Sequence, residues 1–522
     1  MNKRRHWHFL SAAFSALVLA KGAFAEESMP LSYMQGEPMH IGNEVQYLMD
    51  DYMVEDRWKL TRRVGKVEKH LGNPVIVQDQ SWEDNAGAYP SVLFDPVLGK
   101  FRMWYQIDSL TNYFNHKRGP AYAVGYAESD NGFIWTKPRL EGFPFGTSAR
   151  SNVVTAGRNG RGANGIQVMF NPDTSDPQKR LMMVCVGWES VDLAYSPDGL
   201  HWTVREKPLV PAHLDFSNHL LWVPETKLWY LYLRPSILPN GWSSPRTTHL
   251  VALPEGMRHT GRRLSMSTSP DLENWSVQRT FMYPDELTPS PDYDNASVFR
   301  RHGLFISFYS QMFMEQGGSE TELHVATSRD GIHWDRTWDR QPLVPRGLPG
   351  SFDHGQVEPG ASAPVDVGDD MLIYYWGSPA GQSNWSAEGA VGIARLRLDR
   401  FVGQVAGDQT GFLLTRQFVL EGNALRINCV SHPQPYANET DGIRVAIIAA
   451  PDYKTKETTW ETAVPGFSLG DSDRIITDEI EHVVTWKGKS DLSSLRGRAV
   501  YLRFQMKHAE LYTFQVTQED LK

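Results

Sequence analysis

The sequence predicts an all-β protein in which a five-bladed β-propeller precedes a C-terminal β-sandwich. The first observation is a repeated phrase, Ser-x-(Asp/Asn)-Gly-x-x-Trp, that begins at Ser129, Ser196 and Ser328. A further copy at Ser269 has Leu272 in place of the glycine. The copies lie about 60 to 70 residues apart, a period somewhat above that of solenoids, which indicates propeller blades where the repeated unit is made of strands. The Asp-Gly or Asn-Gly pair provides the positive φ of a tight hairpin turn, so the phrase is a scaffold signal.

The second observation is alternation of apolar and polar residues in short segments rich in aromatic and β-branched side chains, which predicts strands. Each of the five units supplies about three of them. The expected strands are 89–94, 101–106 and 121–129 in blade one, 166–170, 180–186 and 191–196 in blade two, 219–223, 228–234 and 263–269 in blade three, 297–300, 304–312 and 322–328 in blade four, and 362–367, 371–376 and 390–398 in blade five.

The third observation is a change of pattern near residue 408, where the repeated phrase stops. Short strands follow, and they indicate an antiparallel sandwich that braces the propeller or binds sugar. The expected strands are 412–415, 424–428, 443–449, 481–486, 499–505 and 511–516. We therefore expect a signal peptide over 1–25, a propeller with an N-terminal lead-in strand (45–52) over 26–407, and a sandwich over 408–522.

The first residues have the pattern of a secretory signal peptide. Lys3, Arg4 and Arg5 precede an apolar run over 9–20, and Ala23-Phe-Ala25 follows as a cleavage site. The apolar run is too short to favour a membrane anchor. The sequence therefore predicts a periplasmic or secreted protein.

Charge and cysteine content narrow the class of partner. The formal net charge is −9 among 522 residues. This acidic balance argues against nucleic acid or an anionic membrane surface as a partner, and the oligomeric state is left open. The two cysteines, Cys185 and Cys429, fall in different expected domains, so two buried free thiols are expected in place of a disulfide.

Acidic and amide side chains precede the innermost strands, which line the central channel of a propeller. Blades three and four share the motif Asp-x-x-Asn, and blade five carries Asp-His-Gly-Gln-Val-Glu at the corresponding place. We expect these groups to meet at one mouth of the channel. The candidate catalytic residues are Asp215, Asp292 and Glu358, and the candidate substrate-binding residues are Asp84, Asn218, Asn295, His354 and Trp82. Two long insertions, 108–120 and 236–262, are candidate rim loops.

Carboxyl groups that lie close together raise one another's pKa, which is the condition that glycoside hydrolysis needs. One carboxylic acid donates a proton to the leaving oxygen, while an ionised carboxylate acts as base or nucleophile. The alternative is structural, because aspartates before strands also cap turns. The sequence contains no CxxC pair, HExxH, P-loop or Gly-x-Ser-x-Gly motif. No cofactor is expected, although carboxylates and carbonyls in a channel would suit a structural calcium ion.

Taken together, the repeats, the Asn-Pro-Val and Pro-Leu-Val-Pro segments that begin blades, and the paired acids resemble the five-bladed β-propeller glycoside hydrolases. These are the arabinanase, invertase and levansucrase superfamily, with families 32 and 43. The resemblance covers about residues 70–400 and implies an exported glycosidase with an aspartate base or nucleophile, a pKa-tuning aspartate and a glutamate general acid, for which Glu358 is favoured. The Asn-Asp-Pro-Asn-Gly box of the invertases is missing, so the early acid could be Asp84, or Asp215 and Asp292 could do the work.

Two other functions remain open. A glycoside phosphorylase on the same fold would need a cationic phosphate pocket near the acids, with Arg234, Arg300 or Arg301 as suppliers. A propeller that binds carbohydrate without cleaving it is the other alternative.

Overall fold

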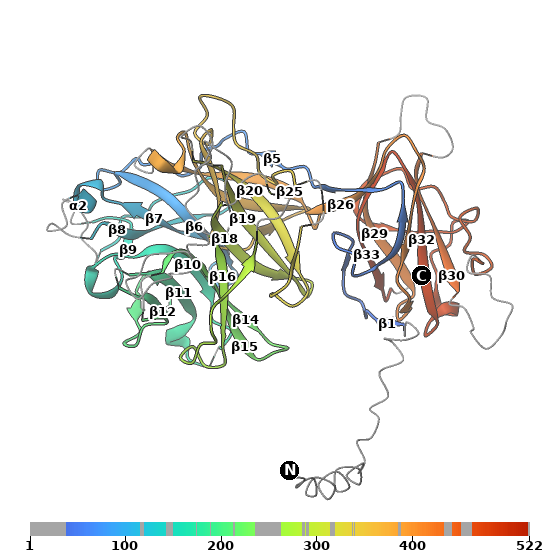
Figure 1. Ribbon diagram of the computed structural model, residues 1–522, viewed down its shortest axis with the longest axis horizontal. Helices are drawn as coiled ribbons and strands as arrows, with labels where there is room; N and C mark the ends of the chain where they lie inside the picture. The colour runs from blue at the N-terminus through green and yellow to red at the C-terminus, as the bar shows by residue number, and fades with distance from the viewer. Residues whose placement is uncertain are drawn as a thin grey trace, which may run out of the picture.

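A computed structural model places most of the chain (Figure 1). It describes residues 38–114, 120–141, 150–173, 175–187, 189–211, 214–234, 263–283, 288, 292–313, 319–336, 338, 340–384, 388–432, 441–449 and 462–519. The expected signal peptide lies outside the described residues, as do the whole insertion 236–262 and residues 115–119 of the other insertion. The fold is nearly all β. Among the described residues, no helix is long and apolar enough to cross a membrane.

Three four-stranded antiparallel sheets follow one another along the chain, and in each the strands pair in sequence order. Their strands are β6 (Asn85–Asp95), β7 (Lys100–Asp108), β8 (Tyr122–Ser129) and β9 (Val153–Thr155); β10 (Asn164–Phe170), β11 (Leu181–Val186), β12 (Val191–Ser196) and β13 (Thr203–Val204); and β14 (Asp215–Val223), β15 (Leu228–Arg234), β16 (Leu264–Ser269) and β17 (Arg279–Met282). The short helix α2 (Leu110–Phe114) and the 3₁₀ turns η1 (Arg158–Gly160) and η2 (Pro177–Lys179) lie in the connections.

A nine-stranded sheet follows, and it consists of two antiparallel halves. The first half holds β18 (Asp292–Arg301), β19 (Leu304–Phe313), β20 (Glu320–Ser328) and β21 (Trp334–Asp335), and the second holds β22 (Gln356–Pro359), β23 (Val365–Val367), β24 (Asp370–Ser378), β25 (Ala390–Arg397) and β5 (Glu68–Lys69), with η5 (Gln382–Asn384) between β24 and β25. A single parallel pair, Thr321 with Gln356, joins the halves. The strand expected at 362–367 is replaced by β22 and β23, because Gly360 and Pro364 interrupt the extended chain between them.

The first strands of these units contact one another in order. β6 contacts β10, β10 contacts β14, β14 contacts β18, and β18 contacts β22. The last unit returns to the first, since β24 contacts β6. Hydrogen bonds cross each boundary that involves β6: Ser91 Oγ bonds the backbone of Val168, and the Ala361 amide donates to the Pro90 carbonyl at 2.8 Å. The units therefore form a closed circuit of contacts.

The repeated phrase forms the hairpin turn between the third and fourth strands, as its residues predict. In the copy at 196–202, Ser196 Oγ accepts from the Gly199 amide at 2.7 Å, and Asp198 Oδ1 accepts from the amides two and three residues later, both at 2.9 Å. Gly199 has φ 77°, a conformation that favours glycine. The Trp202 indole N–H donates to the Gly199 carbonyl at 3.0 Å and folds back over the turn.

Each turn also receives a hydrogen bond from the unit before it in the circuit. The donors are long side chains of the preceding sheet, and the acceptor is the carbonyl of the glycine or of its leucine replacement. The pairs are Tyr374 to Gly132 at 2.7 Å, Trp104 to Gly199 at 2.8 Å, Arg205 to Leu272 at 3.1 Å, and Tyr232 to Gly331 at 2.8 Å. The phrase therefore fastens neighbouring sheets as well as turning the chain.

The remaining strands form two six-stranded sheets. One holds β1 (Met39–His40), β28 (Phe418–Val419), β32 (Ala499–Lys507), β27 (Gly411–Thr415), β3 (Val54–Trp58) and β30 (Gly442–Ala449); the other holds β31 (Asp478–Val483), β29 (Ala424–Ser431), β33 (Ala509–Thr517), β26 (Val402–Ala406), β4 (Thr61–Val64) and β2 (Gln46–Tyr47), and η6 (Ser493–Leu495) precedes β32. All the strands expected beyond residue 408 are present.

Strand pairing corrects the expected role of the N-terminal segment. The sequence analysis assigned 26–407 to the propeller, but β1, β2, β3 and β4 pair with β28, β33, β27 and β26 of the C-terminal sheets. The reason is burial, because Ile41, Leu48 and Met53 pack into the core that these two sheets share. β5 pairs with β25 of the first group of sheets, and Tyr47 and Met49 pack in a core with residues of β18 and β19.

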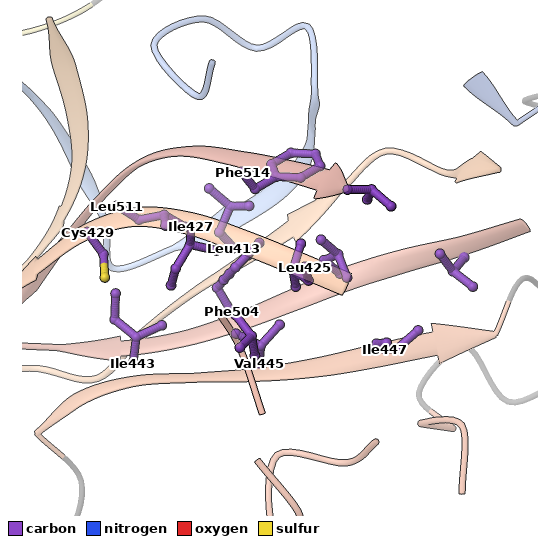
Figure 2. Close-up of a cluster of buried hydrophobic side chains, with 14 of the residues drawn as sticks. Leu413, Leu425, Ile427, Cys429, Ile443, Val445, Ile447, Phe504, Leu511 and Phe514 are labelled. Atoms are coloured by element: carbon purple, nitrogen blue, oxygen red, sulfur yellow. The ribbon is translucent and has the colours of Figure 1, made fainter. Parts of the chain in front are cut away.

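The two C-terminal sheets enclose one hydrophobic core (Figure 2). Leu413 of β27, Val445 of β30 and Phe504 of β32 point into it from one sheet, and Ile427 of β29 and Phe514 of β33 from the other. Cys429 lies in this core and Cys185 in another, both as free thiols, as the sequence predicted. Burial raises the pKa of each thiol to about 12, so both stay protonated at neutral pH.

Candidate functional site

Pairing becomes irregular where the first strands begin. The register shifts between Asn164 and Gln167 in β10, between Asp215 and His219 in β14, and between Tyr293 and Ala296 in β18. β6 shifts in the same way near its start. Such bulges re-aim side chains and occur beside active sites. Asp215, Asn218, Asp292 and Asn295 therefore lie at the irregular starts of the adjacent strands β14 and β18.

Asp292 and Glu358 come from different halves of the nine-stranded sheet, and each contacts the same strand, β19. Asp292 is fully buried and is the cross-strand partner of Met312. Glu358 is 4% exposed and accepts a hydrogen bond from the Ser310 hydroxyl. Ser310 and Met312 are two residues apart and share a face of β19, because side chains alternate along a strand. The two carboxyl groups are thus held at the same end of one strand.

Arginines accompany these acids. Arg234, at the end of β15, lies 2.6 Å from the Asp294 carboxylate, and both side chains are buried. The first residue of β14, Asp215, is the cross-strand partner of Arg234, which places its backbone beside this pair. Arg263 lies 3.7 Å from Asp292. The three candidate catalytic positions therefore follow one another along adjoining strands, with two cations among them.

The amide side chains lie in the irregular segments themselves. Asn218 and Asn295 are buried at equivalent places in β14 and β18. The Asn295 Oδ1 atom accepts no hydrogen bond from any of the residues that the structure describes. Gln382 of η5 lies 3.3 Å from Asp294 and brings another amide to the same place. Amides beside buried carboxyl groups can orient them or bond to hydroxyl groups of a ligand.

Asp108 is a further buried acid that the sequence analysis did not select. It ends β7 opposite Asn85, the first residue of β6. Burial raises its pKa to about 7, a hydrogen bond from Gln106 at 2.7 Å opposes the rise, and the nearby Asp84 carboxylate adds to it. Buried carboxyl groups with raised pKa values are candidates for proton transfer. Sequence reasoning missed Asp108 because it closes an apolar strand and shares no motif with the other acids.

The remaining candidate residues have different surroundings. Asp84 is exposed and accepts a hydrogen bond from the Leu110 amide at 2.8 Å, at the start of α2. His354 is half-buried, with Nδ1 3.2 Å from the Gly347 carbonyl. Trp82 is 7% exposed, packs in a hydrophobic core and donates its indole N–H to Asn152 at 3.0 Å. The indole of Trp82 therefore supports the sheet from inside and presents no face for stacking on a sugar.

Two buried histidines also escaped the sequence analysis. His219 follows Asn218 in β14, and burial lowers the pKa of its imidazole to about 3. His324 in β20 stacks on Tyr309 with ring centroids 5.5 Å apart, and burial lowers its pKa to about 3 as well. Both imidazoles are neutral at ordinary pH, so each can donate or accept one hydrogen bond without adding charge.

The described residues contain no group of three or more His, Cys, Asp or Glu side chains placed to hold a metal ion. The described part of the site contains carboxyl groups, guanidinium groups, amides and neutral imidazoles. Carboxyl groups held among hydrogen-bond donors suit proton transfer to and from an oxygen atom.

No protein-family model matches this chain. A curated protein named "Probable sucrose-6-phosphate hydrolase", from Psychromonas ingrahamii, is 35% identical over 103 residues, which are 18% of this chain and 17% of that protein. The match thus spans about a sixth of the relative's length.

Several solved structures of carbohydrate-processing enzymes are similar. An N-acetylgalactosamine deacetylase from F. plautii, in complex with blood group B trisaccharide, is 14% identical with a TM-score of 0.43, over 66% of this chain and 97% of that one. A glycosyl hydrolase from Bacteroides ovatus is 14% identical with a TM-score of 0.42, over 64% and 96%. A thermostable family-43 glycoside hydrolase is 13% identical with a TM-score of 0.40, over 64% and 91%. The reaction must be argued from the chain's own residues.

Proposed function

We propose that this protein is an exported glycoside hydrolase that cleaves a glycosidic bond in an oligo- or polysaccharide. The observation that carries the proposal is that both acids contact β19: Asp292 pairs with Met312, and Glu358 accepts a hydrogen bond from Ser310. Two buried carboxyl groups in one place are costly unless they are hydrogen-bonded or used. Glycoside hydrolysis uses such a pair.

In the proposed reaction, Glu358 is the general acid. Its carboxyl group gives a proton to the glycosidic oxygen as the bond from that oxygen to the sugar carbon breaks. Asp292 or Asp215 then acts as base on a water molecule or as nucleophile at that carbon, and water supplies the new hydroxyl group. The assignment is supported by the burial of Glu358 and by the hydrogen bond that its carboxyl group accepts from Ser310. Arg263 lies 3.7 Å from Asp292 and provides a cation beside that aspartate.

Substrate binding falls to the polar groups around these acids. Asn218 and Asn295 are suited to bond hydroxyl groups, and Asp84 and His354 stand at the starts of the first and last units. Trp82 acts indirectly, because its contact with Asn152 supports the sheet that carries Asp84.

The proposed architecture is a five-bladed β-propeller followed by a β-sandwich. The closed circuit of contacts, from β6 through β10, β14, β18 and β22 and back to β6 by way of β24, supports the propeller. The core shared by the two C-terminal sheets supports the sandwich. Export to the periplasm or the medium is proposed from residues 1–25 of the sequence.

A screen for released reducing ends tests the reaction. The full-length protein is incubated with a panel of plant, fungal and bacterial glycans, together with Asp292→Asn and a control, Asp366→Asn, which changes an exposed aspartate on β23. We expect turnover of at least one glycan, a loss of about 100-fold or more in Asp292→Asn, and no change in the control. Turnover that Asp292→Asn leaves intact would contradict the assignment of the site.

A phosphorylase remains the second candidate because two buried arginines, Arg234 and Arg263, lie beside the acids. Guanidinium groups bind phosphate well. The two reactions give different products, since phosphorolysis yields a sugar 1-phosphate and hydrolysis yields the free sugar. Adding inorganic phosphate to the same screen therefore separates them. A sugar phosphate that forms only with phosphate present would favour the phosphorylase.

A further inference from the structure

The outer face of one C-terminal sheet carries a groove that none of the candidate acids lines. It has a volume of about 290 Å³ and is lined by Asp56, Arg57, Trp58, Phe412, Leu413, Leu414 and Arg503. Figure 2 shows Leu413, Val445 and Phe504 of this sheet pointing into the core. Because side chains alternate along a strand, their neighbours Phe412, Leu414 and Arg503 point outward.

Strand register arranges the outward side chains in two rows. Trp58 of β3 stands opposite Phe412 of β27, and Asp56 stands opposite Leu414, which in turn pairs with Arg503 of β32. The groove therefore has an apolar floor, an indole at one side and a guanidinium at the other. The outer strands β3 and β32 are separated by two strand spacings, about 10 Å.

The groups at the two sides are available to a ligand. Trp58 is 63% exposed on an edge strand. Arg503 is half-buried, and its guanidinium makes no ion pair or hydrogen bond with any residue in the described part of the chain. Asp56 accepts a hydrogen bond from the Arg57 amide at 2.8 Å, which leaves further acceptor capacity on its carboxylate.

The groove is locally cationic on an acidic protein. Arg57 and Arg503 line it, of which Arg57 is paired with the exposed Asp51 carboxylate at 2.9 Å, and the Lys59 ammonium lies 5.2 Å from the centroid of the Trp58 ring. Asp56 is the one carboxylate among the lining residues, whereas the whole chain has a formal charge of −9. Charge complementarity therefore favours an anionic ligand, and the indole face with its apolar floor favours one that also has a flat C–H surface.

We propose that this groove binds a uronate residue of an acidic polysaccharide. The Trp58 indole stacks on the sugar ring, the Arg503 guanidinium binds the carboxylate, and Asp56 accepts a hydrogen bond from a sugar hydroxyl. The volume fits one or two sugar residues, which is small for a protein partner. The site would hold a polysaccharide chain beside the enzyme and does not depend on the reaction proposed above.

Affinity electrophoresis in native gels tests the site without measuring turnover. The full-length protein is run through gels that contain polygalacturonate and through gels that contain the methyl-esterified polymer, which has the same backbone without the charge. The variants are Arg503→Gln and Trp58→Ala. The matched control is Arg496→Gln, which removes one exposed arginine from the same region outside the groove. Circular dichroism and thermal midpoints verify that each variant folds.

We expect polygalacturonate to retard the protein, and the methyl ester to retard it much less. Both groove variants should bind the polymer about tenfold more weakly. In 0.5 M salt the unchanged protein should also bind more weakly, because the Debye screening length falls to about 3–5 Å. Absence of retardation overturns the proposal, as does equal retardation by the ester. Retardation that the groove variants retain places binding elsewhere and also overturns it. None of these results bears on the hydrolase, which the reducing-end screen tests separately.

Discussion

The guanidinium of Arg234 lies 2.6 Å from the Asp294 carboxylate, and this pair joins the end of β15 to the start of β18. Both side chains are buried, so each charge is compensated by its partner and neither is buried without an opposite charge. The pair also stands beside the candidate acids, next to Asp215 on one side and Asp292 on the other. Stability and the site are therefore coupled at this point.

Replacing one member of that pair should destabilise the protein strongly. Asp294→Ala leaves the buried Arg234 charge without its nearest carboxylate and should cost about 3–5 kcal/mol of unfolding free energy. Asp366→Ala removes the partner of Arg301 at 2.9 Å, but that carboxylate is exposed, so the cost should be about 1 kcal/mol or less. Urea denaturation of both variants measures the difference. Equal costs would show that burial does not set the strength of these pairs.

The pH dependence of stability should report on Asp108. Its pKa is raised from 3.8 to about 7 in the folded protein, because burial disfavours the charged form. Between these values the unfolded chain has lost the proton and the folded protein keeps it, so stability falls as pH rises from about 4 to about 7 and then levels off. In this range the proton on Asp108 lowers the unfolding free energy by at most roughly 1.4 kcal/mol for each unit of pH. Asp108→Asn removes this dependence. Denaturation curves at pH 5 and pH 8 should differ more in the unchanged protein than in the variant, and an identical difference would contradict the raised pKa.

The repeated turn gives a matched pair of glycine substitutions. Gly331 and Gly303 have nearly the same φ, 74° and 76°. A Cβ atom at Gly331 would lie 2.7 Å from the Tyr232 hydroxyl and 2.8 Å from the Phe305 ring, whereas at Gly303 it would meet nothing within 4 Å. Both alanine variants carry the strain of a positive φ, about 1 kcal/mol, and only Gly331→Ala adds overpacking of about 1–3 kcal/mol. Thermal midpoints of the two variants measure that added cost, and no difference between them would rule out close packing at this turn.

Local signals in the sequence predicted most of the strands. The Ser-x-Asp-Gly phrase is read correctly because its hydrogen bonds lie within seven residues, as Ser196 and Asp198 demonstrate. The pairing of strands that are far apart in the chain is not marked by any local motif in the sequence. The attachment of β1–β4 to the C-terminal sheets depends on which core receives Ile41 and Leu48, and residue pattern alone does not specify that.

The candidate site was predictable only in part, for a similar reason. The Asp-x-x-Asn motifs pointed to strands that do begin side by side, because repeated sequence marks equivalent positions. Asp108 has no repeated counterpart, and its burial follows from three-dimensional packing. Trp82 was a candidate for substrate binding because it lies near Asp84 in the sequence, yet its ring packs in a hydrophobic core.

Turnover by Glu358→Gln tests the central claim most directly. The measurement compares kcat/KM of the unchanged protein and the variant on a natural glycan from the screen and on an aryl glycoside whose leaving group needs no proton. If Glu358 is the general acid, the variant should lose about 100-fold or more on the natural glycan, keep its affinity for it, and retain most of its rate on the aryl glycoside. Equal losses on both substrates, or no loss on either, would contradict proton donation by Glu358.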